Sequence, residues 1–172
     1  MKKMVRKLFL LGLLALSSNA YAQQKGDMFV GGNIGFEIAT TNSISASSFT
    51  IAPEFGYFVT KNLKIGASLE YGVGLGTHVF TVNPNVAYYV PITDKLSYTP
   101  QANIHAGLGA SDGYKSGVFG FGLNFASFEY KPTNKFAITA SLINFNYVYI
   151  DESHVASFDL LTSPTIGFRY YF

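Results

Sequence analysis

Apolar and polar residues alternate with a period of two along almost the whole chain after residue 22, and no other feature limits the fold as strongly. Successive side chains of a β-strand point to opposite faces, whereas a helix brings residues three or four positions apart to one face. Between residues 63 and 74 the apolar series is Leu63, Ile65, Ala67, Leu69, Tyr71 and Val73. The intervening residues are Lys64, Gly66, Ser68, Glu70, Gly72 and Gly74. The pattern therefore predicts strands that each have one apolar and one polar face.

Two kinds of break separate the alternating segments. Three short breaks combine turn-forming residues with a lysine, which predicts tight turns at 60–62, 91–94 and 131–134. Four other breaks are rich in Ser, Thr, Gly and Asp, which predicts loops at about 39–48, 75–78, 110–117 and 151–156. Three turns and four loops separate eight strands of about 10 residues or slightly more, with both chain ends on the turn side.

Two of these segments break the alternation. After Val118 the outward series runs Phe119, Phe121, Leu123 and Phe125, but Phe128 and Tyr130 follow in the opposite phase. In the next segment Phe136, Ile138, Ala140 and Leu142 give way to Ile143, Phe145, Tyr147 and Tyr149. A β-bulge adds a residue to one strand and so reverses the phase. The sequence predicts a bulge in each segment without fixing its position.

The first twenty-two residues have the pattern of a secretory signal peptide. Four cationic residues are followed by an apolar stretch from Leu8 to Leu16 and by the small residues of Ala20-Tyr21-Ala22. This stretch is well short of the roughly 20 residues that a spanning helix needs. We therefore predict a signal peptide at 1–22, export through the Sec pathway, cleavage before Gln23 and one domain over 23–172.

The composition after residue 22 is unusual for a soluble domain. Four of the twelve basic residues lie in the predicted signal, so eight basic and ten acidic residues remain, a net charge of −2. No basic patch remains that would indicate nucleic-acid binding. Charged residues make up 13% of the chain, against about 25% in typical globular proteins. High apolar content without a run long enough for a spanning helix leaves a large buried core or a closed membrane barrel.

Three features favour an apolar face that points outward to lipid over a soluble, lipocalin-like barrel. The polar face is rich in glycine and neutral amides, which suits the narrow interior of an eight-stranded barrel. Aromatic residues lie near both ends of the apolar series, as in two interfacial girdles. Those near the turns are Tyr57, Tyr88, Tyr98, Phe136 and Tyr170, and those near the loops are Phe36, Phe49, Tyr71, Phe80 and Phe158. The predicted fold is an all-β, eight-stranded, antiparallel up-and-down transmembrane β-barrel.

The third feature is the end of the chain, where an aromatic residue terminates an outward series. This series is Ile166, Phe168, Tyr170 and Phe172. It resembles the C-terminal signature that the barrel-assembly machinery recognises in bacterial outer-membrane proteins. The whole region after residue 22 resembles the small barrels of the OmpX/OmpA type, and particularly the "outer membrane beta-barrel" proteins of Bacteroidetes, of which the stretch from Ile51 to Leu63 is typical. The resemblance implies a bacterial outer-membrane location, with outer-membrane lipid, lipopolysaccharide and the assembly machinery as partners.

The predicted interior face carries a small set of charged and titratable residues. The candidate polar cluster of the lumen is Glu54, Glu70, Arg169, Lys64 and His105. Charges inside a narrow barrel are costly unless they are paired or hydrated, and the planar guanidinium of an arginine can bridge two carboxylates. We therefore predict that Arg169 pairs with Glu54, Glu70 or both and closes the lumen. The alternative is a wet lumen that these groups line without direct pairing.

Catalytic and metal-binding patterns are weak. His78 and His154 fall in predicted loops, as do Ser111, Asp112 and Ser153, so the loop end of the barrel has the residue types of a Ser/His/Asp set. No nucleophile-elbow or zinc motif occurs. The histidines lack metal-ligand spacing, and no cofactor is expected. We predict a non-enzymatic envelope-structural or surface-interaction protein with a mostly plugged lumen. A narrow channel, a lipid-modifying enzyme and a soluble secreted binder are the alternatives, and an extracellular ligand at the loops stays open.

Overall fold

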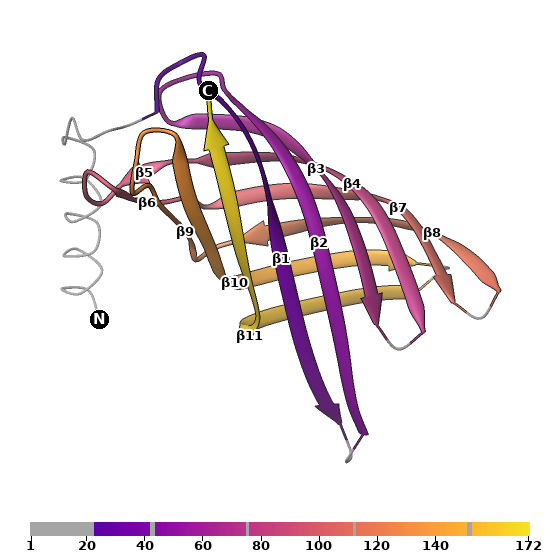
Figure 1. The fold of residues 1–172 in the computed structure, drawn as a ribbon. Helices are drawn as coiled ribbons and strands as arrows, with labels where there is room; N and C mark the ends of the chain where they lie inside the picture. The colour runs from indigo at the N-terminus through magenta and orange to yellow at the C-terminus, as the bar shows by residue number, and fades with distance from the viewer. Residues whose placement is uncertain (1–22, 42–43, 75, 112, 151–152) are drawn as a thin grey trace, which may run out of the picture.

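The computed structural model describes residues 23–41, 44–74, 76–111, 113–150 and 153–172, and every regular element among them is a β-strand (Figure 1). Eight long strands carry the fold: β1 (Met28–Thr41), β2 (Ile44–Phe58), β3 (Leu63–Gly74), β4 (Thr77–Tyr88), β7 (Gln101–Ser111), β8 (Tyr114–Asn124), β10 (Phe136–Ile150) and β11 (Ser153–Tyr171). Three short strands continue β4, β7 and β8 toward the turns: β5 (Val90–Pro91), β6 (Leu96–Tyr98) and β9 (Ser127–Tyr130). The described part of the chain contains no helix that is long and apolar enough to cross a membrane.

The eight long strands form one closed ring. Each pairs antiparallel with the next along the chain, in the order β1, β2, β3, β4, β7, β8, β10 and β11. The last strand then pairs with the first, from Phe29 opposite Tyr171 to Gly35 opposite Thr165. Over that stretch the ring has no free sheet edge, as a lipid environment demands. The predicted eight-stranded antiparallel up-and-down barrel is confirmed.

The three predicted turns are present and share one construction. In the first, the Thr60 hydroxyl accepts a hydrogen bond from the backbone N–H of Leu63 at 3.1 Å. Thr93 accepts in the same way from Leu96, and Thr133 from Phe136, each at 3.1 Å. A threonine followed three residues later by an apolar residue is therefore the repeated unit of this end of the barrel, because the hydroxyl replaces a backbone partner in the turn.

The loops at the other end are much shorter than predicted. Strand β1 continues to Thr41 and β2 begins at Ile44, so most of the predicted loop 39–48 is strand. The loops predicted at 110–117 and 151–156 are likewise mostly strand, because β7 ends at Ser111, β8 begins at Tyr114 and β11 begins at Ser153. The Ser- and Thr-rich composition misled the prediction, since strand pairing uses the backbone and tolerates these side chains.

Both phase reversals are present, and they lie side by side in neighbouring strands. The pairing of β10 with β11 shifts between Ser141 and Ile143. At the same height, the N–H of Phe125 donates to the carbonyl of Ile143, and the N–H of Leu142 donates to the carbonyl of Ala126, both at 2.9 Å. The register shift in β10 gives the position of one predicted phase break, and the interruption at Phe125 and Ala126, between β8 and β9, gives the position of the other. The reversal after β8 turns the side chain of Glu129, on β9, into the barrel, where it is 1% exposed.

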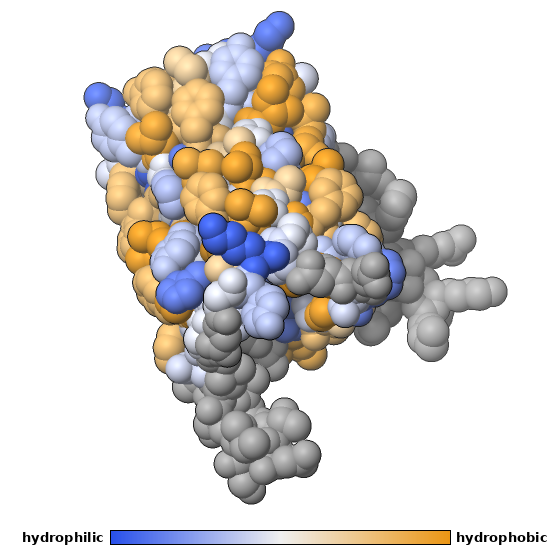
Figure 2. All heavy atoms as spheres, turned by 90° about the vertical axis from the view of Figure 1, so that its right-hand side faces the viewer, coloured by the Kyte–Doolittle hydropathy of each residue, from blue (hydrophilic) through white to orange (hydrophobic). Residues whose placement is uncertain are grey.

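Large apolar side chains cover the outside of the ring. Leu69, in the middle of β3, is 49% exposed, while Lys64 and Glu54 on the opposite faces of their strands are buried. Figure 2 shows apolar side chains spread over the visible wall, with hydrophilic ones in smaller patches. The terminal series also faces outward, with exposed Ile166, Phe168, Tyr170 and Phe172. Apolar groups thus face out and polar groups face in, as predicted. The predicted signal peptide lies outside the described residues.

Among the described residues, the fully buried aromatic rings lie together at the turn end of the interior. Phe29, Phe58, Tyr89 and Tyr171 are buried there, and the centroids of the Phe58 and Tyr89 rings are 4.9 Å apart in an edge-on contact. Gly56 is what admits Phe29, because the Phe29 ring occupies the position that a Cβ at residue 56 would take. We call these four rings the aromatic floor; the polar side chains of the interior lie on its side away from the three tight turns.

Replacing Gly56 with alanine should therefore destabilise the barrel. The buried Phe29 ring has no free space to move into, and overpacking of this kind costs about 1–3 kcal/mol. Urea unfolding of refolded protein measures the change. Gly72→Ala is the matched control, since its new methyl group would meet the Thr50 hydroxyl at 3.6 Å, an ordinary contact. Equal losses in the two variants would contradict the packing assigned to Gly56.

Candidate functional site

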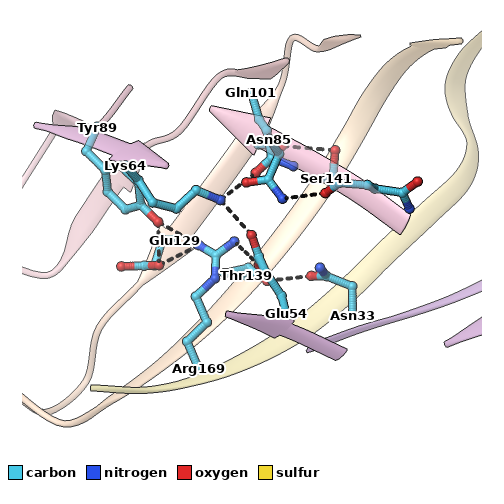
Figure 3. Close-up of polar contacts among 12 residues, drawn as sticks. Asn33, Glu54, Lys64, Asn85, Tyr89, Gln101, Glu129, Thr139, Ser141 and Arg169 are labelled. Carbon is cyan, nitrogen blue, oxygen red and sulfur yellow. Dashed lines mark hydrogen bonds and ion pairs between the residues drawn. The ribbon is translucent and has the colours of Figure 1, made fainter. Parts of the chain in front are cut away.

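Four charged side chains from four strands meet inside the barrel just above the aromatic floor (Figure 3). Lys64 Nζ on β3 is 2.6 Å from Glu54 Oε1 on β2. Arg169 on β11 lies between two carboxylates, with Nη2 2.9 Å from Glu54 Oε2 and Nη1 2.8 Å from Glu129 Oε2. Two cations thus balance two anions, all of them buried. We call Glu54, Lys64, Glu129 and Arg169 the basal cluster.

Uncharged groups add hydrogen bonds to the basal cluster, in which the buried Nε of Arg169 is the one atom without a partner among the described residues. The hydroxyl of Tyr171 donates to Glu129 at 2.8 Å, and that of Tyr89 accepts from Arg169 Nη1 at 2.7 Å. The side-chain amide of Gln23 donates to Glu129 Oε1 at 2.9 Å and is itself buried. Buried ion pairs are tolerated when such bonds satisfy the remaining polar atoms. The cluster and its partners therefore form one connected hydrogen-bonded group inside the barrel.

Aromatic rings flank the cations of this region. The Arg169 guanidinium carbon is 4.6 Å from the centroid of the Phe29 ring, within the range of a cation–π contact. Lys131, in the turn below, places Nζ 3.9 Å from the centre of the Tyr171 ring. Partial burial in that position lowers the pKa of Lys131, while the nearby carboxylates of Glu129 and Asp27 oppose the shift. The side chain of Lys131 thus covers the Tyr171 ring from the side of the turns.

Glu70 and His105 lie apart from the basal cluster, in a separate row of hydrogen bonds. The side-chain amide of Asn83 donates to Glu70 Oε2 at 3.0 Å, and its oxygen is 3.1 Å from His105 Nδ1. The amide of Asn103 is 2.9 Å from His105 Nε2. Of the two carboxylates predicted for Arg169, Glu54 contacts it and Glu70 does not. Glu70 lies six residues along β3 from Lys64, and so away from the basal cluster. The second carboxylate that pairs with Arg169 is Glu129 instead.

We call the end of the barrel opposite the three tight turns the hairpin end. A cavity of about 560 Å³, lined mainly by polar side chains, extends from the basal cluster toward it. Arg169 and Tyr89 line its lower part, and Glu70 and His105 contribute to its wall. Its other lining side chains are mostly amides and hydroxyls, among them Asn33, Thr50, Asn124, Asn144 and Ser157. The interior is therefore a polar chamber above a charged and aromatic floor.

The histidines of the hairpin end are bound to tyrosines. His78 Nδ1 is 2.8 Å from the Tyr71 hydroxyl, and His154 Nδ1 is 2.6 Å from that of Tyr147. Each pair lies on its own hairpin, β3–β4 or β10–β11, on the exposed side of the wall. The predicted partner Asp112 lies outside the described residues. Among those residues, no group of three or more His, Asp or Glu side chains is placed to hold a metal ion.

Sequence reasoning missed four contributors to the basal cluster: Gln23, Tyr89, Glu129 and Tyr171. Tyr89 and Tyr171 stand at polar positions of the alternating sequence pattern, so the alternation could have indicated them. Glu129 could be placed inside only once the bulge was located. Nothing in the sequence pattern points to Gln23, which precedes the first strand.

Comparison with known proteins supports the fold. No protein-family model matches the chain, and no curated protein matches its sequence. The crystal structure of neisserial surface protein A aligns with a TM-score of 0.62 at 14% identity, over 86% of this chain and 99% of that one. The N-terminal β-barrel domain of Pseudomonas aeruginosa OprF gives 0.61 at 15% identity, over 87% and 100%. Ail, the attachment invasion locus protein of Yersinia pestis, gives 0.50 at 12% identity, over 87% and 100%.

These likenesses show that the chain has the fold of small outer-membrane β-barrels. At such low identities they show the fold alone. The narrower resemblance to the barrels of Bacteroidetes stays a prediction.

Removing the charge of Glu129 should destabilise the protein far more than removing that of Glu70. Glu129→Gln leaves two buried cations with one carboxylate, and an uncompensated buried charge costs about 3–5 kcal/mol. Glu70→Gln is the control, because the hydrogen-bonding partner of Glu70 is the neutral Asn83. The midpoint of urea unfolding in detergent micelles measures both. A Glu70 variant as unstable as the Glu129 variant would show that the basal cluster is not the main ionic interaction.

Proposed function

We propose that this protein is an integral protein of a bacterial outer membrane, exported through the Sec pathway and inserted by the barrel-assembly machinery. The observation that carries the proposal is a closed ring of strands with apolar side chains outside and a charged, hydrogen-bonded interior. A soluble barrel would have the opposite arrangement, because water would solvate its outer face. The outward series that ends at Phe172 supports insertion by the assembly machinery. Outer-membrane lipid and lipopolysaccharide then surround the wall.

An arginine on the outer wall should test the lipid contact directly. Leu69→Arg places a charge halfway along β3, where a cation at the bilayer midplane costs about 2–4 kcal/mol. Tyr114→Arg is the matched control at the hairpin end, where Tyr114 is 82% exposed and the cost falls to about 0–1 kcal/mol. Unfolding of both variants in phospholipid vesicles gives the two values. Equal costs, or recovery of the protein from cells without detergent, would overturn the membrane assignment.

Within that membrane we propose a non-enzymatic role in envelope structure or surface interaction, with a lumen closed at the turn end. The basal cluster supports closure, because four charged side chains and two tyrosines from different parts of the barrel wall contact one another in the interior there. An eight-stranded barrel has an interior just wide enough for side chains. The tyrosine partners of His78 and His154 leave neither ring paired with a serine nucleophile in the described region.

The second candidate is a narrow channel, and the polar cavity above the cluster favours it. Ions entering that cavity would have to pass Arg169 and the tyrosines to cross the barrel. The two candidates therefore differ only in whether the basal cluster ever opens.

Conductance in planar bilayers separates them. We expect no steady open state of appreciable size from the wild-type protein, because the ion pairs hold the cluster together. Tyr89→Ala combined with Tyr171→Ala removes two rings from the floor and should allow ion passage. The control is Tyr71→Ala with Tyr88→Ala, which shortens two exposed tyrosines on the outer wall. Steady wild-type conductance would establish the channel and refute the closed lumen.

A further inference from the structure

Each of the three tight turns carries an exposed lysine after its threonine, at the same end of the barrel; Lys131, before the threonine of the third turn, is half-buried against the Tyr171 ring. The repeated unit reads Thr60-Lys61-Asn62-Leu63, Thr93-Asp94-Lys95-Leu96 and Thr133-Asn134-Lys135-Phe136. In all three, the threonine hydroxyl holds the turn through the backbone, so the lysine side chain is not needed for the construction. Lys61, Lys95 and Lys135 are all exposed. We call these three residues the lysine rim.

The positions of these lysines are spread around the whole barrel. The turns join β2 to β3, β5 to β6 and β9 to β10, which are separate sectors of the ring. The remaining sector, where β11 pairs with β1, has exposed Lys25 just before the first strand. Exposed lysines therefore lie in all four sectors of the turn end of the barrel. Asp27 and Asp94 are acidic residues of the same end.

The other end of the barrel has a different charge. Lys115, near the start of β8, is the one lysine or arginine that the sequence places in the hairpin connections and the strand residues beside them, whereas Asp112, Asp151 and Glu152 also fall there. The asymmetry is not a result of ion pairing within the fold, because the ion pairs among the described residues use Lys64 and Arg169. The lysine rim is therefore available to an external anion.

We propose that the lysine rim binds the phosphate groups of anionic glycerophospholipids around the turn end of the barrel. The rim adjoins the outer aromatic residues, since Lys135 directly precedes the exposed Phe136 and Leu63 pairs with the exposed Tyr88. Aromatic side chains of this kind lie at the level of lipid headgroups, where each nearby lysine attracts anionic lipid. Cations distributed around a perimeter suit a ring of separate lipids better than one compact macromolecule. The inference rests on the proposed membrane location.

The test uses the full protein refolded in detergent and titrated with phosphatidylglycerol or with phosphatidylcholine of the same acyl chains. Native mass spectrometry counts the lipids that each protein molecule retains. We expect the wild type to retain phosphatidylglycerol preferentially. The variant K61Q/K95Q/K135Q should lose at least about tenfold of that preference, since one lysine near a lipid surface contributes about fivefold. Added salt should weaken the wild-type preference.

Lys115→Gln is the control, because it removes one exposed lysine at the opposite end of the barrel, outside the lysine rim, and should change the preference much less than the triple variant does. A triple variant that matches the wild type, or a Lys115 variant that loses as much, would overturn the proposal. Binding of soluble peptidoglycan fragments through the same lysines, without any lipid preference, would also overturn it. Failure of the membrane assignment has a different signature, because such a protein would stay folded without detergent and retain neither lipid.

Discussion

The structure depends above all on the backbone pairing of its last strand with its first. In a membrane no water is available to an unpaired N–H or carbonyl, so a row of such groups at an open edge would cost several kcal/mol each. The pairing of β11 with β1 removes that edge over the stretch from Phe29 to Gly35. It also fixes the number of strands in the ring at eight, and a barrel of that size has an interior only about as wide as its side chains.

We call the pairing of β11 with β1 the seam of the barrel. Arg169 of the basal cluster lies in it. Arg169 stands opposite Gly31 in the pairing of β11 with β1, and a Cβ at residue 31 would collide with the backbone of Phe168 and the side chain of Arg169. Glycine at this position therefore lets the two strands meet where the arginine turns inward. From there the guanidinium reaches Glu54 on β2 and Glu129 on β9, so the seam and the ion pairs reinforce each other.

The sequence was sufficient for features that follow from a strict period and insufficient where the chain departs from it. Alternation placed Glu54, Lys64 and Arg169 on one interior face, and the structure brings them together. Glu129 was not predicted, because the break between β8 and β9 at Phe125 and Ala126 reverses the phase, and the position of such a break depends on how neighbouring strands pair. The hairpin connections were predicted too long, because Ser and Thr serve equally well in a loop and in a strand whose partner is already in place.

The arrangement of charges also constrains how the barrel can assemble. Glu54 and Lys64 belong to one hairpin and can pair early, but Arg169 is 115 residues from Glu54 and reaches it only when the last strand docks. Until then Glu129 lacks its cation, and a buried carboxylate without a partner is strongly unfavourable. Burial of the charged side chains at the turn end is thus favourable only when the last strand pairs with the first. A barrel whose last strand is still unpaired must keep these charges hydrated, so closure and formation of the basal cluster should occur as one cooperative step.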